Sequence, residues 1–129
     1  MKTTIWCALV LATIALDASA ARWGPTWSEV TGNLISKTHK HRTAAIIKQI
    51  DGKYDSSRVV KVEPGKRTIV VQSPMRKGFS GTDATMELDL KPCKRYYINA
   101  QFKSGSGTAW EPVIEHVEKI PGCKLPKAA

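Results

Sequence analysis

The chain has 129 residues, with 20 lysines and arginines against 11 aspartates and glutamates, which gives a formal net charge of +9. That length is too short for more than one ordinary domain. Hydrophobic residues make up 42% and charged residues 24%, so composition excludes a wholly disordered, collagen-like or coiled-coil chain.

The first twenty residues carry the pattern of an export signal. Lys2 gives a positive start, residues 5–16 are almost all apolar, and residues 18–20 are small, as a signal peptidase requires. The apolar run is about a dozen residues, short of the roughly 20 that a membrane-spanning helix needs. We therefore predict a signal peptide over residues 1–20, cleavage before Ala21, and a soluble mature protein that is periplasmic or secreted.

Cleavage at that point changes the cysteine inventory. Cys7 leaves with the signal peptide, and it does not follow the small residues as a lipid-anchored cysteine would. Two cysteines remain, Cys93 and Cys123, and in an oxidising compartment we expect them to form a disulfide. A catalytic thiol pair would require a short Cys-x-x-Cys spacing, which this sequence lacks.

The beginning of the mature chain is predicted to be an irregular N-terminal leader over residues 21–43. Helix-breaking or turn-forming residues interrupt any periodic pattern at Gly24, Pro25, Gly32 and Asn33. For Trp23 and Trp27 we expect packing onto the edge of the domain, with insertion into a lipid interface or stacking on a sugar as the alternative.

The pattern then changes to short strands separated by turns. A strand over residues 44–50 ends at Asp51-Gly52, a pair that takes the positive backbone angles of a reversing turn. A valine-rich strand follows at 58–62. Residues 63–66, Glu-Pro-Gly-Lys, have Pro and Gly in the central places of a type II turn, so we expect a hairpin whose second strand is 67–72.

The second half of the chain has the clearest alternation. After a loop over 73–83, apolar residues alternate with charged ones in 86–91, and again with polar ones in 96–103, so each strand should be buried on one face. Residues 104–108 form a glycine-containing turn. A last strand is predicted over 110–120.

Two observations on that last strand complete the fold prediction. Pro112 must lie at a sheet edge or bulge because proline cannot donate to a ladder. The midpoint of Cys93 and Cys123 falls at Thr108, inside the predicted turn, as expected for a hairpin clasped at its open end. We predict an all-β fold, a single antiparallel β-sandwich or open barrel of about six strands clasped by one disulfide, over residues 44–123, with a C-terminal tail over 124–129.

Several of these segments resemble a known kind of module. The runs 47–52, 59–66 and 67–71 resemble the small exported bacterial β-sandwich modules of the PEGA-like kind. The runs 86–90 and 96–100 look like the closing strands of related domains of unknown function in envelope lipoproteins. About half of the chain is covered. The resemblance implies a cell-envelope accessory or surface-binding module and carries over no catalytic residue.

The strongest functional signal is positive charge, which favours anionic surfaces and steers association. The anion-binding candidates are Arg58, Lys61, Lys66, Arg67, Lys94 and Arg95. The alternative is a solvated face that only confers solubility. For an exported protein the anionic partners are lipid head groups, lipopolysaccharide, acidic polymers or an acidic protein. Export separates the mature chain from nucleic acid.

A metal site is the second functional hypothesis. His39 and His41 would place both rings on one side of an extended segment, with His116 or Glu115 as a third ligand. Neighbouring lysines disfavour a cation there, so we predict no metal and no cofactor. A secreted inhibitor or effector that presents its loops is a further alternative.

Catalysis leaves no local mark in the sequence. A hydrolytic set could be assembled only on paper, from Ser73, Ser80 or Ser106 with His116 and Asp83. The sequence has no Gly-x-Ser-x-Gly elbow, no His-Glu-x-x-His pair and no phosphate-binding loop. We therefore predict a non-enzymatic binding module that contacts an anionic envelope component or a protein partner through a basic surface.

Overall fold

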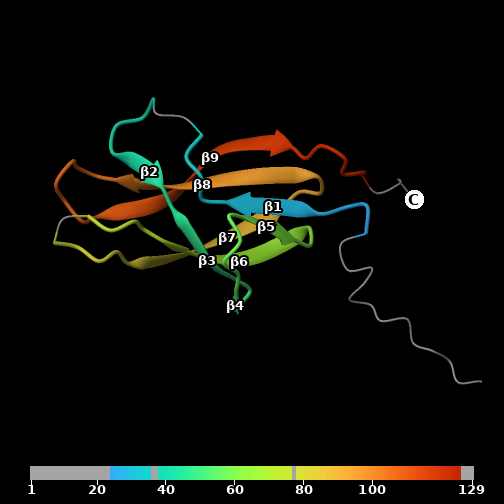
Figure 1. The fold of residues 1–129 in the computed structure, drawn as a ribbon, viewed down its shortest axis with the longest axis horizontal. Helices are drawn as coiled ribbons and strands as arrows, with labels where there is room; N and C mark the ends of the chain where they lie inside the picture. Colours follow the sequence, from blue (N-terminus) through green and yellow to red (C-terminus); the bar gives the residue numbers. More distant parts are fainter. Residues whose placement is uncertain (1–23, 36–37, 77, 126–129) are drawn as a thin grey trace, which may run out of the picture.

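A computed structural model describes residues 24–35, 38–76 and 78–125, and within these ranges the chain is all-β, with two sheets and no helix (Figure 1). In chain order the strands are β1 (Ser28–Thr31), β2 (Arg42–Ala44), β3 (Ile46–Ile50), β4 (Lys53–Tyr54), β5 (Val59–Val62), β6 (Gly65–Gln72), β7 (Asp83–Leu90), β8 (Lys94–Phe102) and β9 (Trp110–Lys119). The described part therefore contains no helix that could cross a membrane. The predicted signal peptide and most of the predicted tail lie outside these ranges.

The first sheet, sheet A, is organised around β8. Strand β9 pairs with β8 along one side, and β1 and β2 share its other side, β1 against the first half and β2 against the second. Strand β5 pairs with β1 at the outer edge. Every pair is antiparallel except β1 with β8, which is parallel. The sheet is therefore mixed, which corrects the prediction of a purely antiparallel fold.

The second sheet, sheet B, is antiparallel and has the strand order β4-β3-β6-β7. The turn between β3 and β4 is the predicted Asp51-Gly52 turn, and both residues have positive φ, 50° and 80°. Strands β6 and β7 pair over eight residues without a register shift. Neither sheet closes into a barrel in the described part of the chain.

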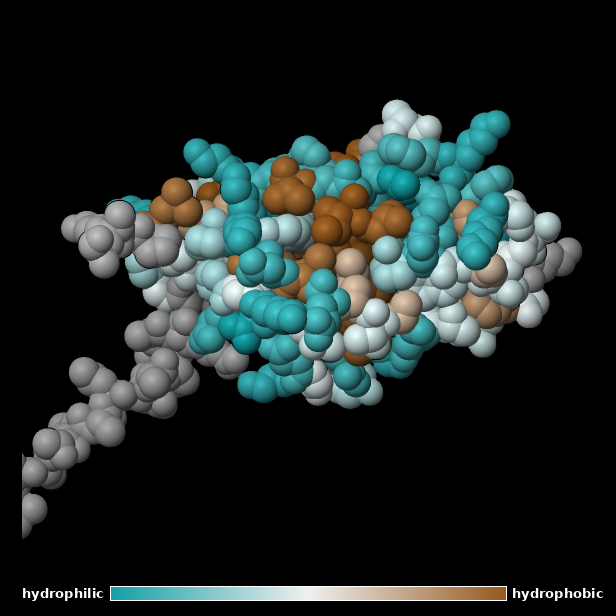
Figure 2. Space-filling model, turned by 180° about the vertical axis from the view of Figure 1, so that it is seen from behind, coloured by the Kyte–Doolittle hydropathy of each residue, from teal (hydrophilic) through white to brown (hydrophobic). Residues whose placement is uncertain are grey.

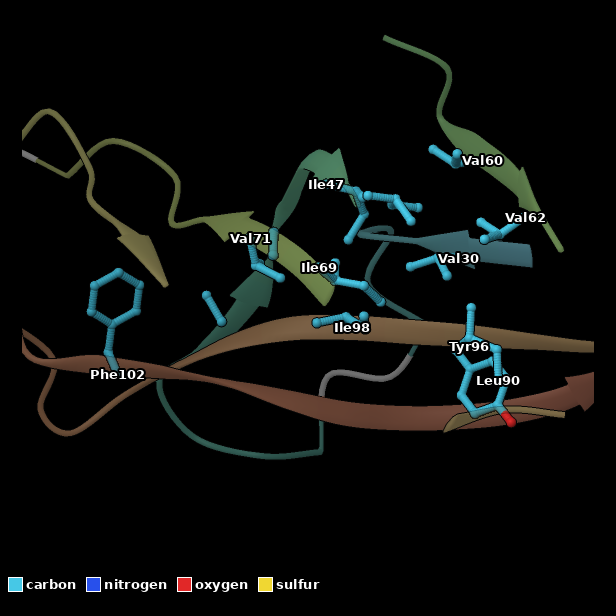
Figure 3. Close-up of a cluster of buried hydrophobic side chains, with 13 residues drawn as sticks. Val30, Ile47, Val60, Val62, Ile69, Val71, Leu90, Tyr96, Ile98 and Phe102 are labelled. Atoms are coloured by element: carbon cyan, nitrogen blue, oxygen red, sulfur yellow. The ribbon is translucent and has the colours of Figure 1, made fainter. Parts of the chain in front are cut away.

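The core lies between the two sheets (Figure 3). Sheet A contributes the side chains of β8 that the alternation predicted, Tyr96, Ile98, Ala100 and Phe102, and all four are buried. Sheet B contributes Ile47, Ile50, Ile69, Val71 and Leu90. The alternation in β7 is confirmed too, because its charged residues are exposed while Leu90 is buried. Apolar burial on this scale is the main favourable term in folding.

The disulfide prediction is confirmed. Cys93 and Cys123 are bonded, with their Cα atoms 5.4 Å apart. They clasp the open end of the β8–β9 hairpin, in which Lys94 lies opposite Lys119. Pro112 lies in β9, which pairs with β8 alone among the described strands and is therefore an edge.

The irregular leader predicted over residues 21–43 is wrong for β1 and β2. Strand β1 is short and contains a single aliphatic residue, Val30, but it is wholly buried between β5 and β8. Its polar side chains can be buried because they have partners: the Ser28 hydroxyl donates to the Lys91 carbonyl at 2.8 Å, and the Thr31 hydroxyl donates to the Arg58 carbonyl at 2.7 Å. Such partners come from residues far along the chain.

Two predicted connections also differ. The predicted hairpin across residues 63–66 does not form, because β5 pairs with β1 in sheet A and β6 pairs with β3 and β7 in sheet B. The turn instead passes the chain from one sheet to the other. The predicted strand over 44–50 is similarly divided at Ala45, where the chain leaves β2 in sheet A and enters β3 in sheet B.

Candidate anion-binding surface

The six cations selected from the sequence lie on three different strands or their ends. Arg58 and Lys61 belong to β5 and the residue before it, Lys66 and Arg67 to β6, and Lys94 and Arg95 to β8. Strand β6 is in sheet B and the other two are in sheet A. The structure therefore does not bring all six into one set, and their surroundings separate them further.

Arg67 is committed to intramolecular contacts. Its guanidinium is 3.1 Å from the Asp51 carboxylate and 3.7 Å from that of Glu63, and it also donates to the carbonyls of Glu63 and Pro64. The Thr68 backbone N–H donates to Asp51 at 2.9 Å. This hydrogen bond, together with Arg67, lowers the pKa of Asp51 below its ordinary value. Arg67 thus stabilises the sheet-to-sheet turn and is not a free cation.

Arg95 lies within a row of alternating charge that crosses sheet A. Lys61, Glu29, Arg95 and Glu118 occupy neighbouring positions on β5, β1, β8 and β9. The Arg95 guanidinium is 2.7 Å from the carboxylate of Glu118 and 3.3 Å from that of Glu29. Glu29 is buried, so Arg95 is needed to compensate its charge.

Tyr97 lies two residues beyond Arg95 on β8 and also contacts this row. Its hydroxyl donates to the Glu118 carboxylate at 2.6 Å. The hydrogen bond from Tyr97, followed by the contact with Arg95, lowers the pKa of Glu118. The pKa of Tyr97 is raised, chiefly by burial. Arg95 is therefore an interior member of an ion-pair network rather than a binding residue.

Lys66 and Lys94 complete the six. Lys66 forms an exposed ion pair with Glu87 on β7, with 3.3 Å between Nζ and Oε2. Lys94 lies opposite Lys119 at the disulfide end of the β8–β9 hairpin, where two like charges face each other. Neither residue lines a hollow of the surface described below.

Lys61 and Arg58 remain without a carboxylate partner among the described residues. The Lys61 ammonium lies 4.8 Å from the centre of the Trp27 ring, a cation–π contact. Trp27 is half-buried, and its backbone N–H points to the Cys123 sulfur at 3.4 Å. Trp27 thus packs against the domain as expected, whereas Trp23 lies outside the described residues.

A cleft opens where the edge of β4 faces β5, and we call it the β4–β5 cleft. It has a volume of about 290 Å³, and its lining residues are Ile50, Asp51, Lys53, Tyr54, Asp55, Val60, Lys61, Val62, Glu63 and Arg67. A second hollow of about 210 Å³ shares Asp55 with it and is lined by Arg58. Tyr54 is 72% exposed at the rim. With Arg67 engaged by Asp51 and Glu63, the cations available here are Lys53, Arg58 and Lys61.

Lys53 and Tyr54 are not among the candidates that the sequence indicates. They form β4, a strand of two residues that pairs with β3. A signal for them was present, because the Asp51-Gly52 turn that was recognised reverses the chain and places the next residues beside the preceding strand.

Two of the candidate metal ligands, His39 and Glu115, lie near each other, and His41 has other surroundings. His39 lies 3.9 Å from the Glu115 carboxylate, measured from Nδ1 to Oε1. His41 has a positive φ of 60°, so the backbone is not extended there, and its ring lies beside Gly105 in the β8–β9 loop. Within the described ranges, no group of three or more His, Cys, Asp or Glu residues is placed to hold a metal ion.

The hydrolytic residues considered from the sequence have separate partners. The Ser73 hydroxyl is buried and accepts a hydrogen bond from the Thr82 backbone. Asp83 pairs with Lys48 at 2.7 Å. His116 lies against Tyr97, with ring centres 5.9 Å apart. These contacts stabilise the sheets.

Comparison of the chain with protein-family models, with curated proteins and with solved structures finds no match.

Proposed function

We propose that this chain is an exported, non-enzymatic binding module whose two sheets are the layers of a β-sandwich and whose β4–β5 cleft binds an anionic component of the cell envelope. The export pattern of residues 1–20 and the resemblance to PEGA-like envelope modules support the class of protein. The binding residues that we propose are Lys53, Arg58 and Lys61, with Tyr54 at the rim.

One observation carries this proposal: most of the described carboxylates form ion pairs within the chain. Lys or Arg lies within 4.0 Å of Glu29, Asp51, Glu63, Asp83, Glu87, Asp89, Glu115 and Glu118. The positive excess of the chain is therefore concentrated on the cations that lack such a partner. Two of them, Lys53 and Lys61, line the β4–β5 cleft, and a third, Arg58, lines the neighbouring hollow.

The chemistry of these groups suits a phosphate-bearing surface. Lysine and arginine are phosphate binders through charge and hydrogen bonds, and a concave site holds such a group more closely than a flat face does. An exposed tyrosine beside them is a side chain typical of membrane interfaces. We therefore expect phospholipid head groups or lipopolysaccharide phosphates as ligands.

The test compares two triple variants of equal charge. The first replaces Lys53, Arg58 and Lys61 by glutamine. The second, the control, replaces Lys94, Lys119 and Lys124 by glutamine, which removes the same charge from unpaired cations near the disulfide. Binding is measured by co-sedimentation with phosphatidylglycerol vesicles and with lipopolysaccharide.

Each cation near an anionic membrane contributes about 1 kcal/mol, so the cleft variant should bind roughly 100-fold more weakly than the unmodified protein. The control variant should lose much less, and circular dichroism should show that both are folded. Equal losses in the two variants would mean that only net charge matters, and the cleft would then not be the site.

A further inference from the structure

The opposite side of the molecule, between β7 and β9, differs from the cleft. Residues directly opposite each other in an antiparallel pair point to the same face of the sheet. In sheet A, the buried Ile98 lies opposite Ile114, and the buried Tyr96 lies opposite Val117. Ile114 and Val117 of β9 therefore point toward the core side of the sheet.

These two side chains are not covered by sheet B. Ile114 is 43% exposed and Val117 is 41% exposed. On β7, the core-facing Met86 and Leu88 are only partly buried, although Met86 lies opposite the fully buried Ile69. We call these four residues the β7–β9 seam. The face of the molecule in Figure 2 shows apolar side chains gathered at its centre between hydrophilic borders.

The seam is closed at both ends. At one end the Trp110 indole N–H donates to the Thr82 hydroxyl at 2.7 Å, and the Trp110 ring packs against Phe102. At the other end the Lys91 backbone N–H donates to the Tyr96 hydroxyl at 2.9 Å. Between these contacts the two sheets share an apolar interior that is open to solvent along one side.

The hydrogen-bonding edges beside the seam are unequal. Strand β7 pairs only with β6 among the described strands, over eight residues with no bulge, and it contains no proline or glycine. Strand β9 is protected by Pro112 and by a bulge opposite Tyr97 and Ile98. The other edges, β2, β4 and β5, have only three, two and four residues. Strand β7 is thus the long, regular free edge of the described fold.

The charge on β7 and β9 indicates which kind of peptide the free edge of β7 would bind. Strands β7 and β9 contain six of the 11 acidic residues of the chain but only one of its 20 lysines and arginines, Lys119. The outward-facing acids of β7 include Glu87 and Asp89, whose ion pairs are exposed and therefore weak. An incoming lysine or arginine can compete for these carboxylates.

We propose that β7 binds an extended segment of a partner protein, which adds a strand to sheet B and fills the β7–β9 seam. Side chains of the added strand alternate between the two faces. Those beside Met86 and Leu88 must be apolar, and those beside Glu87 and Asp89 should be lysine or arginine. The ligand is therefore an extended peptide with alternating apolar and basic residues, and its site is distinct from the β4–β5 cleft.

Three eight-residue peptides test this, matched to the eight residues of β7. One alternates valine and lysine. The second alternates threonine and lysine, which keeps shape and charge but removes the apolar groups, and the third alternates valine and glutamate. Binding is followed by amide chemical shifts and hydrogen exchange in the full mature protein.

The valine–lysine peptide should bind and should protect the amides of β7, while either control peptide should bind about tenfold more weakly or worse. Equal binding of the threonine–lysine peptide, or protection of β5 instead of β7, would overturn the proposal. Protection of β7 that depends on protein concentration without peptide would show that a second copy of the chain is the occupant, and would also overturn it.

A pair of variants tests the seam itself. Ile114→Lys places a charge in the seam, and Ile46→Lys places the same charge at an isoleucine that is similarly exposed, 50%, on β3. Both should remain folded by circular dichroism. Only Ile114→Lys should weaken binding of the valine–lysine peptide, by about tenfold or more. Equal behaviour of the two variants would exclude the seam as the site.

Discussion

Sheets A and B leave two open sides, the β4–β5 cleft and the β7–β9 seam, and different kinds of side chain are exposed on them. At the β4–β5 cleft the edge strands are short, so their ends and the loop between them leave a hollow lined by charged groups and Tyr54. At the β7–β9 seam the edge strands are long, so the uncovered region is continuous and apolar. In this fold the short edge strands border a pocket, and the long edge strands border an apolar strip.

The charges follow the same division. Lys53, Arg58 and Lys61 line the cleft or its neighbouring hollow, together with Asp55. Acidic residues predominate on the strands that border the seam. A phosphate-bearing ligand and a basic peptide would therefore choose opposite sides. Experiments that alter one side and spare the other are the most direct way to examine this contrast.

The largest expected effect comes from the disulfide, because it clasps β9 directly and contacts the cleft side through Trp27. The bond joins residues 30 positions apart, and the chain-entropy model gives a stabilisation of about 3.7 kcal/mol. The double variant Cys93→Ser, Cys123→Ser should show a loss of that order in urea unfolding. In native-state hydrogen exchange, β9 should lose protection before β4 and β5 do.

If β5 lost protection as early as β9, the two sides would not be independent units. Intact-mass measurement with and without reductant provides the control, since the native protein should gain about 2 Da on reduction and the double variant should not.

The next effect separates the filled core from the open seam. Ile98 and Ile114 lie opposite each other, but Ile98 is fully buried and Ile114 is not. Ile98→Ala should reduce the free energy of unfolding by 2 to 5 kcal/mol, roughly the usual cost of a core cavity. Ile114→Ala should cost about 1 kcal/mol or less. Similar losses, measured by urea denaturation, would show that the seam is closed in solution.

The smallest effect is a dependence of stability on pH. The pKa of Asp51 at the cleft and that of Glu118 on β9 are both lowered in the folded protein. A lowered folded-state pKa stabilises the fold above the ordinary pKa, which is 3.8 for Asp51, and this stabilisation is lost as the pH falls through the folded value. The melting temperature should therefore fall as the pH decreases below about 4.

Asp51→Asn removes the contribution of Asp51 to the pH dependence, so the melting temperature should fall less steeply below about pH 4. Glu118→Gln should reduce the pH dependence by a separate amount, because Glu118 lies on β9. An unchanged profile in Asp51→Asn would mean that the Asp51–Arg67 contact does not stabilise the cleft.

Sequence patterns predicted the parts of the fold that depend on neighbours along the chain. Alternation gave the buried faces of β7 and β8, the Asp51-Gly52 pair gave a turn, and the spacing of Cys93 and Cys123 gave the clasped hairpin. Each of these signals lies within one strand or one hairpin. They are local, and local signals can be read without knowing the rest of the fold.

The errors were non-local. Strand β1 has little apolar character of its own, and it is a strand because β5 and β8 border it. The hairpin predicted at residues 63–66 fails because those strands have other partners. The candidate site could be predicted only in part for the same reason. The cations can be identified in the sequence, but which of them form ion pairs depends on distant acids such as Glu29, which is 66 residues from Arg95.

The parallel pairing of β1 with β8 also has a consequence for the timing of folding. Glu29 and Arg95 are separated by 66 residues, and at a synthesis rate of about 5–20 residues per second the first strand waits roughly 3–13 seconds for its partner. Sheet A cannot assemble during that interval. The newly made chain therefore cannot complete sheet A until β8 has been synthesised.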